Sequence, residues 1–229
     1  MAKKSKAKPI APSTPSFYQH SPINIVDSIA AVLPPIEFRY RPLVVGDLVP
    51  GTAGHGYNVQ FNGEVGGLRV GKVEAKLVQL HFHAKSEHHV DGHEFPMELH
   101  LVHEIDQPTT QSTLMVVGVF FNVEAKRKST DAKVLLASFF KALMFDKRAS
   151  PTDPFDLNNL LPQDPLGYFG YYRYEGSLTT GDLDEKVSWV ILRQPVTAIK
   201  SDIAPLIAAA PHKDLPTQEL NRRFILRNF

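Results

Sequence analysis

The chain has 229 residues, 43% apolar and 21% charged, a composition that excludes a wholly disordered chain, a collagen and a coiled coil. Its 25 basic and 24 acidic side chains leave a formal net charge of +1, so no global basic field would collect nucleic acid. Eighteen prolines and 14 glycines favour a fold with many turns over a helical bundle. Because there are no cysteines, disulfides and thiolate chemistry are excluded, and any metal site must use His, Asp or Glu.

The first 16 residues, rich in lysine and proline, are predicted to be a disordered arm, and residues 17–229 a single domain. No apolar segment follows the basic start, so an intact signal peptide is not expected. No run approaches the ~20 apolar residues of a membrane span. These features favour the cytoplasm. A periplasmic or secreted protein whose signal peptide has been removed is the alternative.

Alternating or β-branched runs dominate the rest of the chain and predict strands. They span residues 23–29, 37–45, 57–61, 68–83, 94–105, 113–125 and 185–194. A helix is predicted at 131–144, with candidate N-caps at 129–131, and a shorter one near 201–210. The Pro-rich stretch 149–167 is predicted to be a long loop. The predicted fold class is therefore mostly β (α+β), with short helices at the periphery.

Seven of the ten histidines fall between residues 81 and 103. Side chains two apart in a strand share a face, so His81 and His83 point the same way. The dipeptide Asp91-Gly92 predicts a two-residue hairpin turn, and an unbroken hairpin would place His83 opposite His100.

The three histidines would then converge on one face of the hairpin. Pro96 and the polar residues 85–89 predict a bulge in it, and a one-residue slip would break the convergence.

Three neutral imidazoles on two strands, His81, His83 and His100, form the ligand set of a catalytic zinc ion, with a fourth position left for water. Gln79 and Glu98 each stand two residues before a ligand, where they would accept hydrogen bonds that fix the ligand tautomers. The alternative is a His-rich polar strand face that holds no metal.

Four histidines of this segment are predicted to lie outside the ligand set. His88, His89 and His93 are predicted to be turn residues on the solvent side. His103 has the wrong parity with His100 and is predicted to be packed or hydrogen-bonded.

The segment Gln79-Leu80-His81-Phe82-His83, with Ser86-Glu87-His88 and residues 97–103, resembles the α-class carbonic anhydrases. Three further segments are similar to that family. Residues 21–25 resemble its N-terminal signature, residues 54–59 its proton-shuttle region, and residues 174–180, followed by Trp189, its active-site loop. The resemblance extends from about residue 21 to residue 221.

This resemblance implies a central, twisted, largely antiparallel sheet with zinc at the base of a conical cleft. It implies a zinc lyase that hydrates CO₂ reversibly to bicarbonate and a proton, by attack of zinc-bound hydroxide on CO₂. CO₂ and bicarbonate would be its small-molecule partners. The resemblance also allows a homodimer.

The resemblance assigns roles to residues beyond the ligands. Thr179 would orient the hydroxide and donate a hydrogen bond to Glu87, Thr180 would contact bicarbonate, and His55 would shuttle protons through water ordered by Tyr57 and Asn58. The backbone carbonyl of Asn221 would support His83. An apolar wall for CO₂ would comprise Val102, Leu114, Val116, Leu178, Val187 and Trp189.

Some features depart from the family pattern and keep an alternative open. The aromatic stretch before Ser21-Pro22 is missing, and residues 1–16 and the C-terminus are unusual. The alternative is a zinc-stabilised scaffold or interaction protein with weak or no turnover. Taken alone, His55 could be a surface histidine, Glu87 a solvated turn acid, and Val116 and Trp189 ordinary core. Ester hydrolysis by the same hydroxide would be a side activity.

Overall fold

The computed structural model describes most of the proposed domain. The described residues are 17–50, 57–108, 110–125, 152, 154–164, 167–201, 203–204 and 215–229. The predicted helix at 131–144 and the predicted shuttle residue His55 lie outside them. Of the predicted helix near 201–210, residues 201, 203 and 204 are helical, as is the preceding Lys200. No helix in the described part is long and apolar enough to cross a membrane.

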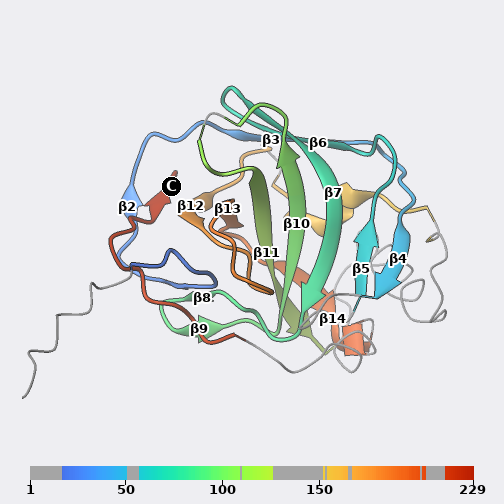
Figure 1. The fold of residues 1–229 in the computed structure, drawn as a ribbon. Helices are drawn as coiled ribbons and strands as arrows, with labels where there is room; N and C mark the ends of the chain where they lie inside the picture. The colour runs from blue at the N-terminus through green and yellow to red at the C-terminus, as the bar shows by residue number, and fades with distance from the viewer. Residues whose placement is uncertain are drawn as a thin grey trace, which may run out of the picture.

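The fold is mostly β, as predicted (Figure 1). The described strands are β1 (Asn24–Ile25), β2 (Ile29–Ala30), β3 (Ile36–Tyr40), β4 (Asp47–Pro50), β5 (Tyr57–Gln60), β6 (Gly66–Val70), β7 (Val73–His83), β8 (His89–Val90), β9 (His93–Glu94), β10 (Met97–Ile105), β11 (Leu114–Glu124), β12 (Tyr171–Gly176), β13 (Val187–Leu192), β14 (Val196–Ile199) and β15 (Leu226–Arg227). A 3₁₀ turn, η1 (Leu157–Leu160), interrupts the predicted long loop. The Asp156 side chain caps it by accepting a hydrogen bond from Asn158 N.

In the described part, twelve strands form one sheet and three form another. The large sheet runs β2-β15-β12-β13-β11-β10-β7-β5-β4, with β14 beside β11 and the β3–β6 pair joined to β7. Most pairs are antiparallel, whereas β11 pairs with β13 and β14 in parallel, as β15 does with β2. Figure 1 shows β7, β10 and β11 at the centre of the sheet. The predicted largely antiparallel sheet is thus confirmed.

Strand β7 shows how the sequence pattern produces the sheet. Buried Ala75 and Leu77 alternate with exposed Glu74 and Lys76 in its first half, whereas its last four residues are all buried. The predicted run 68–83 was too long, because a turn separates β6 from β7. Gly71 has a φ of +62° in this turn, a conformation that glycine adopts without strain.

Several strand predictions missed real strands or their ends. The run predicted at 37–45 ends as a strand at Tyr40, because Pro42 interrupts it. Strands β4, β12, β14 and β15 were not predicted as strands. Three of these have four residues or fewer, and such short strands derive their geometry from pairing with neighbours rather than from their own pattern.

Two hydrophobic clusters account for the core. The larger one includes Leu80, Leu99, Val117 and Phe121 and is built from one face of the central strands. The smaller one includes Trp189 and lies on the opposite face, to which the even-numbered residues of β10 and β11 point. This second face also carries the histidines.

Candidate metal centre

A row of paired residues crosses the central strands and positions two of the predicted ligands. Asn58 of β5 lies opposite His81 of β7, which lies opposite His100 of β10. His100 in turn lies opposite Gly118 of β11. Because directly paired residues point to the same face of a sheet, the side chains of His81 and His100 meet.

The predicted register was wrong by two residues. The Asp91-Gly92 hairpin does form, and β8 pairs with β9 in the predicted register. Residues 84–88 and 95–96 lie outside strands, so beyond this bulge Glu98, rather than His100, lies opposite His83. A shift of two residues preserves the face of every side chain, and the predicted convergence of the three histidines is therefore confirmed.

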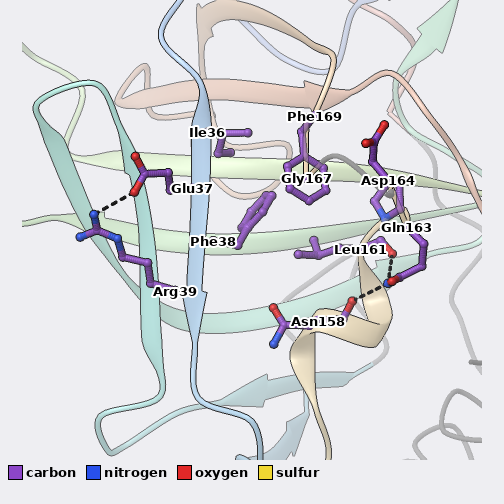
Figure 2. Close-up of a pocket in the computed structure, with 11 residues that line it drawn as sticks. Ile36, Glu37, Phe38, Arg39, Asn158, Leu161, Gln163, Asp164, Gly167 and Phe169 are labelled. Atoms are coloured by element: carbon purple, nitrogen blue, oxygen red, sulfur yellow. Dashed lines mark hydrogen bonds and ion pairs between the residues drawn. The ribbon is translucent and has the colours of Figure 1, made fainter.

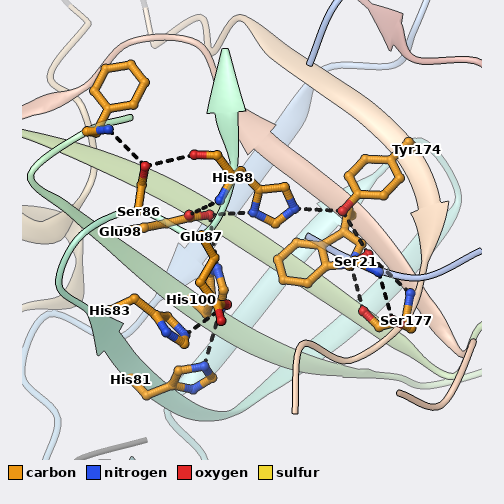
Figure 3. Close-up of polar contacts among 12 residues, drawn as sticks. Ser21, His81, His83, Ser86, Glu87, His88, Glu98, His100, Tyr174 and Ser177 are labelled. Atoms are coloured by element: carbon orange, nitrogen blue, oxygen red, sulfur yellow. Dashed lines mark hydrogen bonds and ion pairs between the residues drawn. The ribbon is translucent and has the colours of Figure 1, made fainter. Parts of the chain in front are cut away.

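The three imidazoles come close enough to share one ion. One ring nitrogen from each of His81, His83 and His100 lies within 4.8 Å of the others. Nδ1 of His100 is 3.3 Å from Nε2 of His81 (Figure 3). All three side chains are buried. The carboxylate of Glu87 points to the same place, with Oε2 3.3 Å from His83 Nε2 and 3.9 Å from His100 Nδ1.

Glu98 fixes the orientation of the His100 ring. Its Oε1 accepts a hydrogen bond of 2.9 Å from His100 Nε2, which directs Nδ1 toward His81. Burial alone would raise the pKa of Glu98, but the neighbouring His88 and His100 hold it well below its usual range. Burial also lowers the pKa of His100, which favours the neutral imidazole that a metal requires.

His88 is not the solvent-side turn residue that the sequence predicted. It is fully buried. Its backbone N and its Nδ1 donate to the two carboxylate oxygens of Glu98, at 2.9 and 2.8 Å. Its Nε2 lies 2.6 Å from the Tyr174 hydroxyl. The bulge folds residue 88 inward, over the sheet, so a strand-and-turn pattern could not place it. His93 is exposed, as predicted, whereas His89 is half-buried, and both lie in the short strands β8 and β9 rather than in the turn.

A buried hydrogen-bond chain leads from His88 to the N-terminal segment. The Tyr174 hydroxyl donates to Ser21 Oγ at 2.9 Å, and Ser177 N donates to the same oxygen. Ser21 N donates to Ser177 Oγ at 2.9 Å (Figure 3). Sequence reasoning missed this chain, because its members are up to 156 residues apart and no spacing links them.

Gly118 has no side chain, and the Glu98 carboxylate occupies the space that a side chain would fill. A Cβ at this position would lie 2.9 Å from Glu98 Oε1 and 2.6 Å from the side chain of Ile191. A side chain at residue 118 would therefore displace the carboxylate that orients His100.

The donor set fits a zinc ion. Three neutral imidazoles that converge from two adjacent strands are a known zinc ligand set. His88, Glu98 and His100 also come within 4.8 Å of one another. In that second group, however, both nitrogens of His88 are already hydrogen-bonded, to Glu98 and Tyr174. The group of His81, His83 and His100 is therefore the better metal site.

Comparison with known proteins agrees with this geometry. A family model described as eukaryotic-type carbonic anhydrase matches residues 9–228. The chain belongs to this family.

A carbonic anhydrase of Neisseria gonorrhoeae is 31% identical over 212 residues, covering 90% of this chain and 76% of the relative. Two solved carbonic anhydrases have the same fold. The α-carbonic anhydrase of Photobacterium profundum is 29% identical with a TM-score of 0.74, covering 93% of this chain and 90% of its own. Carbonic anhydrase Cah3 of Chlamydomonas reinhardtii, in complex with acetazolamide, is 26% identical with a TM-score of 0.77, and each chain is fully covered.

The apolar residues that the resemblance predicts as a wall for CO₂ lie beside the three histidines. Val102, Val116 and Trp189 form a row across β10, β11 and β13, next to the row of His81 and His100. The remaining members, Leu114, Leu178 and Val187, belong to the same cluster or pack against it. The centres of the Trp189 and His100 rings are 4.9 Å apart, so this cluster packs directly against His100.

The structure also places other residues to which the family resemblance assigns roles, and those roles stay predictions. Thr179 is buried and Thr180 half-buried, in the loop after β12. Asn221 is exposed, and its Nδ2 donates to Tyr18 O at 2.6 Å, so support of His83 by its backbone stays a prediction. The supporting role of Gln79 and the conical cleft also stay predictions.

A separate groove of about 470 Å³ opens between β3 and η1 (Figure 2). Its lining includes Phe38 and Phe169, whose rings meet edge to face at 5.0 Å. No histidine is among the described residues that line this groove, so it does not compete with the metal centre.

Proposed function

We propose that this carbonic anhydrase catalyses the reversible hydration of CO₂ to bicarbonate and a proton, with a zinc ion held by His81, His83 and His100. The observation that carries the proposal is the convergence of three buried imidazoles, one of them oriented by the carboxylate of Glu98. When bound, a zinc ion with neutral ligands supplies a water molecule whose pKa is lowered to ~7.

The chain's own residues would hold CO₂ beside the metal. CO₂ is apolar, so it is held by apolar side chains rather than by hydrogen bonds. Val102, Val116 and Trp189 provide such a surface in the row adjacent to the ligands. Leu178 and Val187 extend it.

Glu87 and Thr179 would orient the reacting group. Both are buried, and the Glu87 carboxylate points to the ligand nitrogens. The Thr179 hydroxyl would donate a hydrogen bond to Glu87 and accept a hydrogen bond from the reacting group, which directs the lone pair of that group toward CO₂. Thr180 would then contact the bicarbonate product.

Proton release would use a water molecule held beside β5. The Oδ1 atom of Asn58 is buried, faces the same side as His81, and accepts no hydrogen bond in the described part of the protein. It is therefore an acceptor suited to an ordered water molecule. From there the proton would pass to His55, because an imidazole side chain can exchange a proton near neutral pH.

Stopped-flow CO₂ hydration on the zinc-loaded protein tests the proposal. We expect a rate that rises with an apparent pKa of ~7. His100→Ala should lose zinc and the rate together. His93→Ala, at an exposed position of β9 in the same segment, is the matched control and should retain both.

A rate no faster than buffer in the zinc-loaded protein would overturn the proposal, as would an unchanged rate in His100→Ala. Stoichiometric zinc without turnover would favour the zinc-stabilised scaffold instead.

A further inference from the structure

The loop between β5 and β6 contains the dipeptide Asn62-Gly63. The sequence has eight asparagines, and only Asn62 is followed by glycine; the other seven precede Ile, Val, Val, Asn, Leu, Arg and Phe. The backbone nitrogen that follows an asparagine can attack its side-chain carbonyl carbon, and glycine leaves that nitrogen unshielded. Asn62 is therefore the asparagine whose sequence most favours this attack.

The local structure leaves Asn62 and Gly63 open to this reaction. Both residues are exposed and lie outside strands. A Cβ built on Gly63 would have nothing within 4 Å, and no hydrogen bond in the described residues uses the backbone nitrogen of Gly63. Neither residue has a positive φ, so no tight turn requires a glycine here. The nitrogen can therefore approach the Asn62 side chain without disturbing the sheet.

The Asn62 side chain fastens this loop to β4. Its Nδ2 donates a hydrogen bond of 2.6 Å to Asp47 Oδ2. Asp47 is the first residue of β4 and lies opposite Gln60, the last residue of β5. Among the strands described, β4 is at the edge of the large sheet and pairs only with β5 (Figure 1). The contact between Asn62 and Asp47 therefore closes one end of an edge strand pair.

We propose that Asn62 is a site of spontaneous deamidation, and that the product loosens the attachment of β4. In the first step the Gly63 nitrogen forms a bond to Asn62 Cγ and gives up its proton. The Cγ–Nδ2 bond breaks, and the amide nitrogen leaves with that proton as ammonia. The product of this step is a cyclic imide.

Water then opens the imide. The hydroxyl of a water molecule adds to one of the ring carbonyl carbons, the bond from that carbon to the ring nitrogen breaks, and the nitrogen takes the remaining proton. Attack on Cγ gives aspartate, and attack on the backbone carbonyl carbon gives isoaspartate. Water is consumed and ammonia is released in equal amounts, with no oxidant or reductant. Either product lowers the formal net charge of the chain from +1 to zero.

The new carboxylate replaces an attraction with a repulsion. A carboxylate donates no hydrogen bond at neutral pH, so Asp47 loses its donor. Two carboxylates at hydrogen-bond distance also repel each other, and Asp47 is held in place because it begins a paired strand. An edge strand is held along one side only, so we expect β4 to open more often after the reaction. Because the contact lies at the surface, salt should screen the repulsion.

Peptide mapping by mass spectrometry tests the reaction, on the zinc-loaded full chain aged at mildly alkaline pH. We expect residue 62 to deamidate before any other asparagine, and ion exchange to resolve the more acidic form. Gly63→Ala is the matched variant, since its Cβ meets no neighbour in the structure yet hinders the attack on Asn62. It should slow the reaction at least ~10-fold.

Hydrogen exchange of the β4 backbone amides tests the consequence. Asn62→Ala should raise the exchange rate about fivefold, the effect of one lost hydrogen bond. Asn62→Asp should raise the rate further, because it adds the repulsion, and high salt should remove this excess. Adding Asp47→Asn to Asn62→Asp exchanges donor and acceptor, so the double variant should regain slow exchange.

Deamidation of residue 62 at the rate of the other asparagines would overturn the proposal, as would a rate that Gly63→Ala leaves unchanged. Exchange in Asn62→Asp equal to that of the wild type would refute the link to β4. A double variant that exchanges as fast as Asn62→Asp would refute it too. None of these measurements depends on CO₂ hydration.

Discussion

Glu98 and His100 stand two positions apart on β10, and the glutamate oxygen Oε1 accepts a 2.9 Å hydrogen bond from the histidine Nε2. The same carboxylate accepts two hydrogen bonds from His88. It therefore joins the candidate metal ligand His100 to a buried histidine that contacts Tyr174. Substitutions at Glu98, at Gly118 and at His88 can separate the contribution of this carboxylate to metal binding from its contribution to stability.

Glu98→Gln should weaken zinc binding by ~10–100-fold, because a neutral amide oxygen is a weaker acceptor than the carboxylate and holds His100 less firmly with Nδ1 directed at the metal. Competition with a chromophoric chelator measures the affinity. Glu104→Gln, at an exposed position of the same strand, is the control and should bind zinc like the wild type. Equal affinities for all three proteins would refute the role of Glu98.

Gly118→Ala should destabilise the protein by about 1–3 kcal/mol, since the added Cβ must displace Ile191 and the Glu98 carboxylate. Chemical denaturation measures the stability, and zinc affinity should fall in parallel. Gly63→Ala serves as the control, because nothing lies within 4 Å of its added Cβ. A Gly118→Ala protein as stable as Gly63→Ala would show that the site relaxes without penalty.

His88→Phe should cost about 3 kcal/mol of stability, because it removes the Nδ1 donor from the buried Glu98 carboxylate and leaves that charge with only the backbone N–H of residue 88 and His100 as partners. His93→Phe changes an exposed residue of β9 in the same segment and should stay within about 0.5 kcal/mol of the wild type. Thermal and urea unfolding of the zinc-free proteins provide the comparison. Similar losses in the two variants would contradict the buried role of His88.

The strand pattern was sufficient to predict that the three candidate ligands converge, although the predicted register was wrong. Parity decides which face a side chain occupies, and His81, His83 and His100 keep their parity whether His100 pairs with residue 83 or 81. The bulge after His83 changes the pairing by an even number. The central sheet was predictable for the same reason, since β7, β10 and β11 are long and strongly patterned.

What the sequence could not predict depends on contacts between distant segments. His88 was taken for a turn residue because its neighbours are polar, yet Glu98 and Tyr174 bind it in the interior. Short strands such as β2 and β15 exist only through pairing with each other and with β12. No local pattern carries that information.

His103 lies on the face of β10 opposite to His100, and its burial makes the stability of the protein depend on pH. The residue was predicted to be packed or hydrogen-bonded, which is confirmed: Nδ1 donates to Met115 O at 3.2 Å, and Nε2 lies 2.9 Å from the Tyr40 hydroxyl. Burial lowers the pKa of His103 from 6.5 to about 4. Because the folded protein resists a proton that the unfolded chain accepts, stability should fall as the pH drops from 6.5 to 4, by about 3 kcal/mol in total.

Urea denaturation of the wild type and His103→Gln across this pH range isolates the contribution of His103. Glutamine does not titrate, and its amide can still donate to Met115 O. The stability difference between the two proteins should therefore change in favour of the variant as the pH falls. The other histidines are common to both proteins and cancel in the difference. Parallel stability profiles would show that His103 does not carry this pH dependence.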